Sequence, residues 1–353
     1  MFHDALVPFA ERRIIQMIKE ITELYGKKIL LTGITGMIGR ALIRCLMEEN
    51  EKNNAGIQIT GVSRNQERAN MRLDKYMASP LFTYHAADIN EPLPEMGSFD
   101  YIIHGASNTH PKQYSSDPIG TIAANVWGTK NLLDYMVKHD CGRFVFLSSV
   151  EIYGENRGDT ETFTEDYLGY IDCNTLRAGY PESKRLGETL CNAYAKQYNI
   201  DFVIPRLSRV YGPGLLDDDS KAISQFIHKA AAGENIVLKS KGNQLYSYTY
   251  EEDCAEAILL LMLKGKSGEA YNVADPKSTA TLAELAQILA DIAGTEVVFE
   301  LPDEVEAAGY STATKAILNT NKLESFEWIP QIEIHKGLKK TVEEFKGNKI
   351  KHE

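Results

Sequence analysis

Short apolar runs alternate with amphipathic stretches along the first part of the chain. The apolar runs have the length of buried strands and lie at 28–31, 57–62, 101–107, 143–149 and 201–208. The stretches between them carry apolar residues at helical spacing, as in 38–50, 125–139 and 182–198. Continuously apolar strands that alternate with helices predict an α/β fold, with a doubly wound parallel sheet covered on both faces.

The remaining sequence predicts a smaller C-terminal lobe. After Gly212 the loops become longer and more aromatic, and this lobe is expected to close over the edge of the sheet where open α/β sheets bind ligands. Thr281 and Glu284 have the spacing of a capping box at the start of a helix. The expected division is an N-terminal helix at 1–25, the sheet domain at 26–208, a mainly substrate-binding lobe at 209–346 with a segment near 246–262 returning to the sheet, and a charged tail at 347–353.

Composition and charge exclude several classes of protein. Of the 353 residues, 43% are hydrophobic and 25% are charged, as in ordinary folded proteins. The net charge of −11 opposes binding to nucleic acid or to an anionic membrane, and no apolar run is long enough to span a bilayer. The five cysteines lie far apart, which predicts neither a metal site nor disulfides and suits the cytoplasm. The N-terminus does not have the pattern of a secretory signal, so we expect an unprocessed chain.

A glycine-rich turn follows the first predicted strand. Its sequence, TGITGMIG, sets Gly33, Gly36 and Gly39 at GxxGxxG spacing between a strand and a helix. Gly33 permits the tight turn, Gly36 lets the backbone approach a pyrophosphate, and Gly39 lets the helix pack on the strand. The amides at the start of the helix can donate to an anion. This context favours a Rossmann-type dinucleotide site over a glycine-rich connection that binds no ligand.

The end of the second strand bears on the kind of dinucleotide. An acid is expected there to hold the adenine ribose hydroxyls, whereas this chain has Ser63 followed by Arg64. Arg64 could accept a 2′-phosphate, so NADP is possible beside NAD; alternatively, Arg64 stacks on adenine or faces solvent. Asp88, after the third strand, could meet the adenine amino group or simply cap the end of that strand.

A tyrosine and a lysine four residues apart open a later helix. Tyr180 and Lys184 share one helix face, so the phenol and the ammonium can point into the same cleft. Lowering the pKa of a tyrosine from about 10 to near 7 takes roughly 4 kcal/mol of preferential stabilisation of the phenolate. The lysine and an oxidised nicotinamide, both positive, can supply it and make the phenolate a general base. In isolation such a pair is more often a surface pair, but the phosphate turn upstream reverses that preference.

Two further candidates follow the strand at 143–149, whose carboxyl end should reach the same crevice. Ser149 could share a hydrogen bond with a substrate hydroxyl and with the tyrosine. Glu151 could act as a second acid or base. The alternatives are a strand-end turn residue for Ser149 and a solvated loop charge for Glu151.

Together these motifs resemble the extended short-chain dehydrogenase/reductases of the NAD-dependent epimerase/dehydratase family, which modify nucleotide sugars. The likeness runs in the expected order from about Lys28 to Phe345. It is most similar to the branch of the UDP-glucuronate decarboxylases and dTDP-glucose 4,6-dehydratases. The motifs that carry it are TGITGMIG, HGAS at 104–107, NVWGTKNLL, SSVEIYG, YPESK and RLSRVYGPG.

The resemblance implies a role for individual residues and no metal site. Tyr180 and Lys184 are the implied catalytic pair, with Ser149 as the hydroxyl partner and Glu151 as the glutamate of the branch. The implied contacts of the cofactor, NAD or possibly NADP, are Gly33, Thr35, Gly36, Met37, Ile38, Gly39, Ser63, Arg64, Asp88, Ile89, Ala106, Ser107, Asn125, Tyr180 and Lys184. The implied contacts of the nucleotide-sugar substrate are Ser148, Arg209 and Tyr246.

Three positions depart from the pattern of the branch. Val150 stands where the dehydratases carry an aspartate that protonates the departing C6 hydroxyl, and valine cannot donate a proton. Tyr246 stands where the decarboxylases usually carry an arginine, and Arg209 replaces the usual asparagine. We hypothesise that Arg209 restores the positive charge lost at position 246 and holds the diphosphate.

The implied reaction begins when Tyr180 takes a proton from a sugar hydroxyl, at C4, while the hydride on that carbon moves to the nicotinamide. The resulting 4-keto sugar can lose CO2, undergo elimination, or epimerise at C4 or C5, and Glu151 could remove the C5 proton. The resemblance also implies a homodimer and a place in surface polysaccharide assembly. Two alternatives stay open: a one-way NAD(P)H-dependent reductase or dehydrogenase, and a non-catalytic dinucleotide-binding sensor or scaffold.

Overall fold

A parallel sheet forms the centre of the larger part of the molecule. The computed structural model describes residues 21–109, 116–300 and 314–350, with backbone only at 348–350. The sheet has eight strands in the order β11-β7-β5-β4-β1-β2-β3, with β6 paired to β7, and all these pairs are parallel. The strands are β1 (Lys28–Thr32), β2 (Gln58–Ser63), β3 (Phe82–Ala86), β4 (Tyr101–His104), β5 (Arg143–Phe146), β6 (Ser148–Ser149), β7 (Asp201–Leu207) and β11 (Glu269–Val273).

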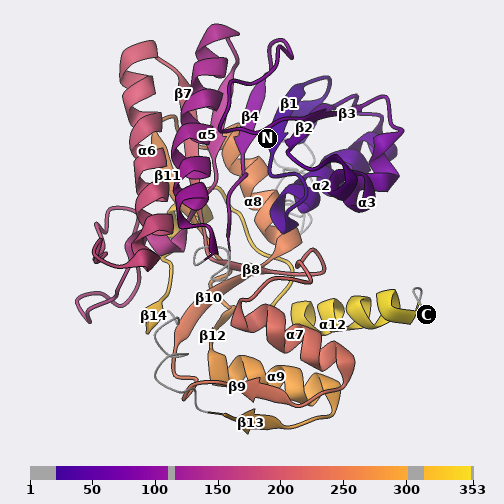
Figure 1. Cartoon of the computed structure of the whole chain (residues 1–353), viewed down its shortest axis with the longest axis vertical. Helices are drawn as coiled ribbons and strands as arrows, with labels where there is room; N and C mark the ends of the chain where they lie inside the picture. Colours follow the sequence, from indigo (N-terminus) through magenta and orange to yellow (C-terminus); the bar gives the residue numbers. More distant parts are fainter. Residues whose placement is uncertain (1–20, 110–115, 301–313, 351–353) are drawn as a thin grey trace, which may run out of the picture.

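Helices cover both faces of this sheet, which confirms the predicted doubly wound α/β fold (Figure 1). Within β1, Ile29 and Leu31 pack into one core cluster and Leu30 into another, because successive side chains of a strand point to opposite faces. The apolar residues of β1 are therefore needed on both of its faces. The helices on one face are α2 (Met37–Asn53), α3 (Gln66–Met77) and α8 (Glu251–Lys264), and those on the other are α5 (Pro118–Lys138) and α6 (Gly179–Tyr198).

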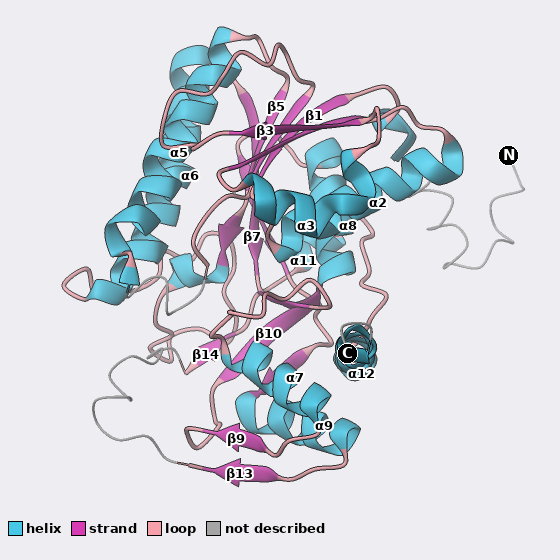
Figure 2. Cartoon of the chain, turned by 45° about the vertical axis from the view of Figure 1, so that its right-hand side comes forward, coloured by secondary structure: helices cyan, strands magenta, loops and turns pink. Residues whose placement is uncertain are grey.

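The second lobe has its own small sheets and its own core (Figure 2). Its core gathers Tyr211, Tyr248 and Tyr250, all fully buried, together with aliphatic residues of three helices. The predicted capping box of Thr281 and Glu284 is confirmed at the start of α9. The lobe contains β8 (Arg209–Tyr211), β10 (Leu245–Tyr250), β12 (Thr279–Thr281) and β14 (Lys315–Ala316) in one sheet, β9 (Ile236–Leu238) and β13 (Val297–Phe299) in another, and α7 (Ala222–Ala232), α9 (Leu282–Ala293) and α12 (Ile334–Ile350).

The chain passes between the two parts more than once. β10 belongs to the small sheet, whereas α8 directly after it packs on α2, and β11 then pairs with β7 of the large sheet. α11 (Asn321–Glu324) lies against β11. The separate cores support a division near residue 208, which we keep as a proposal.

The two terminal segments are only partly described. The expected helix at 1–25 lies mostly outside the described residues, whose first turn, Thr22–Leu24, is a 3₁₀ turn with Leu24 buried. α12 continues to Ile350, beyond residue 347 where the tail is expected to begin, and Gly347 does not have a positive φ that would end the helix. None of the helices in the described ranges combines the length and the apolar character that crossing a membrane requires.

Candidate active site

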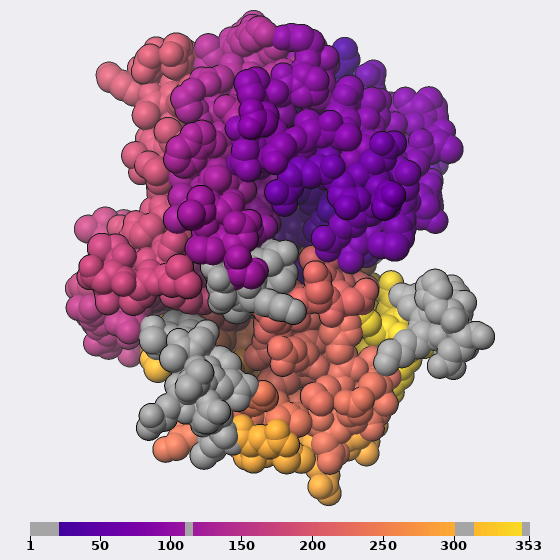
Figure 3. Space-filling view, viewed as in Figure 1, coloured from indigo at the N-terminus to yellow at the C-terminus, as the bar shows by residue number. Residues whose placement is uncertain are grey.

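A cavity of about 760 Å³ lies at the carboxyl edge of the large sheet, where the second lobe adjoins it. Its walls come from the ends of β1, β2, β4 and β6, from the first turns of α2 and α6, and from β8, α7 and β10. Figure 3 shows the two parts meeting across the middle of the molecule. Open α/β sheets bind ligands at this edge.

The phosphate turn forms one wall of the cavity. Gly33 has a φ of +76°, and a Cβ there would lie 2.6 Å from the carbonyl carbon of Gly105. A Cβ on Gly39 would lie 2.3 Å from the carbonyl oxygen of Gly33, so α2 packs on the turn only because this residue is glycine. Among the described residues no side chain caps α2, and the amides of its first turn are therefore available to a ligand. Thr35, Met37 and Ile38 line the same wall.

Thr32 ties the phosphate turn to the neighbouring strand end. Its Oγ1 accepts hydrogen bonds from the amides of Gly105 and Ala106, both at 3.2 Å, and lies 2.9 Å from Nδ1 of His104. These bonds hold the turn after β4 in position, so that Ala106 and Ser107 line the cavity beside the phosphate turn.

The ends of β2 and β3 line the far end of the cavity through Ser63, Arg64, Asp88 and Ile89. Oδ1 of Asp88 accepts the amide of Asn90 at 3.0 Å, so this carboxylate does cap its strand end. This bond uses Oδ1 alone, and a contact between Asp88 and the adenine amino group stays a prediction.

Asn125 is the one predicted cofactor contact that does not line the cavity. It is fully buried between α5 and α6, where its Nδ2 donates to the carbonyl oxygen of Thr121 at 3.2 Å and to Oγ of Ser183 at 3.0 Å. The side chain thus fixes the two helices against each other. A contact between Asn125 and the cofactor stays a prediction that this geometry does not support.

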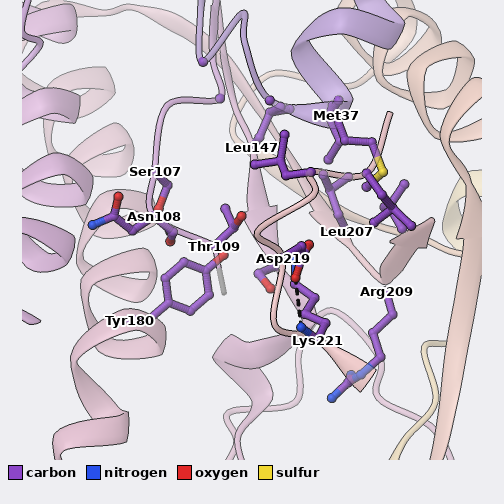
Figure 4. Close-up of a pocket in the computed structure, with 18 of the residues that line it drawn as sticks. Met37, Ser107, Asn108, Thr109, Leu147, Tyr180, Leu207, Arg209, Asp219 and Lys221 are labelled. Carbon is purple, nitrogen blue, oxygen red and sulfur yellow. Dashed lines mark hydrogen bonds and ion pairs between the residues drawn. The ribbon is translucent and has the colours of Figure 1, made fainter. Parts of the chain in front are cut away.

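Tyr180 and Ser149 both line the cavity, and their side chains are hydrogen-bonded. Figure 4 shows Tyr180 at the cavity wall. Burial raises the pKa of the Tyr180 phenol, and a hydrogen bond with Ser149 lowers it. Of the charges that act on this pKa, Glu151 raises it and Arg177 lowers it. Ser149 also accepts the amide of Glu151 at 3.2 Å, which fixes the start of the turn Val150–Tyr153.

Lys184 is 3% exposed and lines the same cavity. Its Nζ donates to the carbonyl oxygen of Leu147 at 2.8 Å and lies 4.9 Å from the centre of the Phe146 ring. Burial lowers the pKa of Lys184 to about 7, although the carboxylate of Glu188 acts in the opposite direction. The cation that lowers the pKa of Tyr180 is Arg177, whereas the sequence suggests Lys184 for that part.

Two guanidinium groups flank the carboxylate of Glu151. Nη2 of Arg177 lies 3.2 Å from Oε2, and Nη2 of Arg209 lies 3.6 Å from Oε1. The guanidinium of Arg209 also stacks on Tyr246, 3.4 Å from the ring centre. The group therefore carries one positive charge in excess, and all four side chains line the cavity. Glu151 is an ion-paired residue rather than a solvated loop charge.

Arg177, Asp219 and Lys221 line the cavity and have no counterpart among the sequence predictions. Arg177 precedes Tyr180 by three residues, a helical spacing that could have signalled a shared side. Ser148, predicted as a substrate contact, lines the cavity, but its Oγ donates to Oε1 of Glu188 at 2.6 Å. The second lobe adds an ion pair of Lys221 with Asp219 at 3.0 Å, visible in Figure 4. In the described ranges no three His, Cys, Asp or Glu residues gather as metal ligands would.

A family model matches most of the chain. The model described as "NAD dependent epimerase/dehydratase family" matches residues 29–274, which include the phosphate turn, Ser149, Tyr180, Lys184 and Arg209.

Individual proteins are similar over nearly the whole length. UDP-glucuronic acid decarboxylase 6 of Arabidopsis thaliana is 31% identical over 322 residues, covering 90% of this chain and 89% of that protein. A dTDP-glucose 4,6-dehydratase of Streptomyces venezuelae, solved with NAD bound, is 25% identical with a TM-score of 0.79, covering 91% and 97%. An epimerase of Methanothermobacter thermautotrophicus is 20% identical with a TM-score of 0.80, covering 95% and 96%, and supports the fold alone.

Proposed function

The chain belongs to the NAD-dependent epimerase/dehydratase family, and from this premise we propose that it converts one nucleotide sugar into another through a transient 4-keto sugar. The observation that carries the proposal is that Ser149, Tyr180 and Lys184 share one cavity with the phosphate turn. A non-catalytic scaffold or sensor could bind a dinucleotide without a serine, a tyrosine and a lysine placed together beside it. Similarity to a UDP-glucuronic acid decarboxylase makes UDP-linked uronic acids the first substrates to test.

The residues present fit a nicotinamide dinucleotide. An added Cβ at Gly36 would meet only the Gly33 carbonyl oxygen, at 3.3 Å, so the backbone there is open to a pyrophosphate. The turn 33–39 would hold the pyrophosphate, and the ends of β2 and β3 would hold the adenosine. When bound, the cofactor accepts a hydride from a sugar carbon and gives it back.

Tyr180 is the proposed general base for the sugar hydroxyl. Because burial raises the pKa of its phenol, the residue needs positive charge in the cavity before it can hold a phenolate. Arg177 supplies part of that charge, and we propose that Lys184 and the oxidised cofactor supply the rest. Ser149, already hydrogen-bonded to the phenol, would share the proton of the substrate hydroxyl.

Glu151 is the proposed base for the second step. A ketone at C4 acidifies the hydrogen on C5 and makes a carboxylate on C5 a β-keto acid. The carboxylate of Glu151 lines the cavity, where it is ion-paired with Arg177 and Arg209. Val150 cannot protonate a leaving hydroxyl, which favours epimerisation or decarboxylation over dehydration.

Arg209 is the proposed contact of an anionic part of the substrate. Its side chain is 19% exposed, and the 3.6 Å between its Nη2 and Oε1 of Glu151 is long for a hydrogen bond. A diphosphate or a sugar carboxylate could therefore attract it while Arg177 remains on Glu151.

We also propose that the enzyme is a homodimer and works in the cytoplasm. Ile119, Trp127 and Leu186 are exposed apolar residues on α5 and α6, a pattern that suits an interface between copies. The five cysteines are unpaired, which suits a reducing compartment.

The test is incubation of the full chain with UDP-, dTDP-, GDP- and CDP-sugars without added cofactor, with products identified by mass and NMR. We expect one sugar to be converted with no net change in the redox state of the cofactor. Tyr180→Phe should abolish cofactor reduction, whereas Glu151→Gln should permit reduction and block the later step. Conversion that requires a stoichiometric supply of NAD(P)H would favour the one-way reductase, and normal turnover by Tyr180→Phe would refute the assigned base.

A further inference from the structure

We propose that the cofactor of this chain is NADP, recognised in preference to NAD through its 2′-phosphate by Arg64 and Arg68 beside the end of β2. The inference rests on the proposed function, because it requires a dinucleotide in the cavity. It goes beyond that function by assigning a phosphate site to residues outside the catalytic group.

The end of β2 has no carboxylate that could hold a free 2′-hydroxyl. In dinucleotide folds, a carboxylate at this strand end holds the ribose of NAD, and an arginine nearby accommodates the phosphate of NADP. The cavity is lined here by Val62, Ser63, Arg64 and Asn65, followed by Arg68, and none of these is acidic. Glu67, in the first turn of α3, does not line the cavity.

Ser63 is small and already engaged by its neighbour strand. The hydroxyl of Tyr84 donates to the carbonyl oxygen of Ser63 at 3.0 Å, and Oγ of Ser63 lies 3.4 Å from that hydroxyl. The side chain therefore leaves space beside the strand end without adding negative charge. The carboxylate at the end of the next strand, Asp88, accepts the amide of Asn90.

Arginines of two helices gather around the phosphate turn. Nη1 of Arg72 donates to the carbonyl oxygen of Thr35 at 3.1 Å, and its Nε is buried without a partner. Burial, and after it the positive charges of Arg68 and Arg40, lower the pKa of Arg72. Cations assembled in this way repel one another unless an anion lies among them, and a phosphate monoester would be such an anion.

The acidic residues that face this group neutralise it only weakly. Asp217 and Asp218, in the loop between β8 and α7, act on Arg72, and Nη2 of Arg68 lies 4.0 Å from Oδ1 of Asp218. The side chain of Asp218 is 60% exposed, so water screens this pair. Arg64 is exposed and makes no hydrogen bond or ion pair with the residues that the structure describes, which leaves its guanidinium able to close on a phosphate.

Equilibrium binding of NADP⁺ and NAD⁺ to the full chain, freed of any cofactor that copurifies, tests the proposal by calorimetry. We expect NADP⁺ to bind about tenfold or more tightly than NAD⁺, as one or two charge-assisted hydrogen bonds would give. Arg64→Ala should weaken NADP⁺ about tenfold and leave NAD⁺ within about twofold, and Ser63→Asp should reverse the preference. Arg157→Ala is the matched control, because Arg157 is exposed and does not line the cavity.

Two results would overturn the inference while leaving the proposed function intact. One is NAD⁺ binding as tightly as NADP⁺ to the unaltered chain. The other is an equal loss of both dinucleotides in Arg64→Ala, which would mean that Arg64 stacks on adenine. Failure of both dinucleotides to bind would reject the inference and the proposed function together.

Discussion

The side chains around Glu151 give one wall of the cavity an excess of positive charge. The carboxylate of Glu151 pairs with the guanidinium groups of Arg177 and Arg209. The guanidinium of Arg209 also stacks on the ring of Tyr246. Partly buried charges interact more strongly than exposed ones, since water screens them less. The excess positive charge therefore favours an anionic substrate such as a nucleoside diphosphate sugar.

Arg209→Ala tests whether the positive charge of Arg209 binds the anionic substrate. Because a charge-assisted contact would be lost, we expect the affinity for UDP and for the UDP-sugar substrate to fall by about tenfold or more. Calorimetric titration with UDP measures the change, and Arg157→Ala is again the control. An Arg209→Ala variant with unchanged affinity would show that Arg209 does not hold the substrate.

Lys184 gives the ligand-free protein a specific dependence of stability on pH. Burial lowers its pKa from the ordinary 10.5 to about 7, so between these values the unfolded chain binds a proton that the folded chain does not. The free energy of unfolding should therefore rise with pH across this window, relative to Lys184→Met. Urea unfolding of both proteins at a series of pH values measures the difference, and parallel curves would contradict the lowered pKa.

Residue-level prediction from the sequence succeeds where a simple geometric rule applies. Strand ends meet at one edge and helix positions four apart share a face, which is why Ser149, Tyr180 and Lys184 are expected in one cavity. Arg177 escapes prediction because its approach to Glu151 depends on how the non-periodic stretch 154–178 folds. Asn125 is expected at the cofactor from a motif, but its hydrogen bonds go to helix packing.

At the scale of elements, two glycines of the phosphate turn serve different purposes. Gly39 is needed for the packing of α2 on the turn, and Gly36 for the approach of a pyrophosphate. Gly39→Ala puts a methyl group 2.3 Å from the Gly33 carbonyl oxygen, so backbone must shift. We expect a loss of about 1–3 kcal/mol in the free energy of unfolding together with loss of dinucleotide binding. Gly36→Ala meets the same oxygen at 3.3 Å and otherwise open space, so it should lose binding with little loss of stability.

Thermal unfolding and dinucleotide titration of the two alanine variants make the comparison. Equal destabilisation by both substitutions would mean that Gly36 also serves packing. Unaltered dinucleotide binding by Gly36→Ala would show that the turn at Gly36 does not contact the pyrophosphate.

Five strands of the large sheet, β1, β2, β4, β5 and β7, are predictable because each lies in an apolar run between amphipathic helices. β3 (FTYHA) and β11 (EAYNV) are interrupted by polar residues and have no counterpart among the predicted runs. The second lobe is harder, since its strands are short and their partners lie far away along the chain. β9 and β13, for example, have three residues each and pair Ile236 with Val297. Such pairings depend on tertiary packing, for which a three-residue run contains too little periodicity.

At the scale of the whole molecule, α5 and α6 present the apolar surface expected of an interface. Trp127 is 55% exposed and Ile119 is 79% exposed on this surface. Trp127→Glu should convert a dimer to a monomer, because it sets a charge in a buried contact. Light scattering after size-exclusion chromatography measures the mass.

Phe299→Glu is the matched control for the dimer, since Phe299 is 59% exposed on β13 in the second lobe, away from α5 and α6. It should leave the mass unchanged. A monomeric unaltered chain, or a dimer that persists in Trp127→Glu, would exclude this interface.

The proposed reaction oxidises the sugar and reduces it again within one cavity before the product leaves. The most direct measurement is conversion of UDP-sugars that carry deuterium at C4, UDP-glucuronate among them, by the full chain without added cofactor. We predict that the product keeps the deuterium, as mass spectrometry and NMR would show. A product without the label, or no conversion of any nucleotide sugar, would contradict the account.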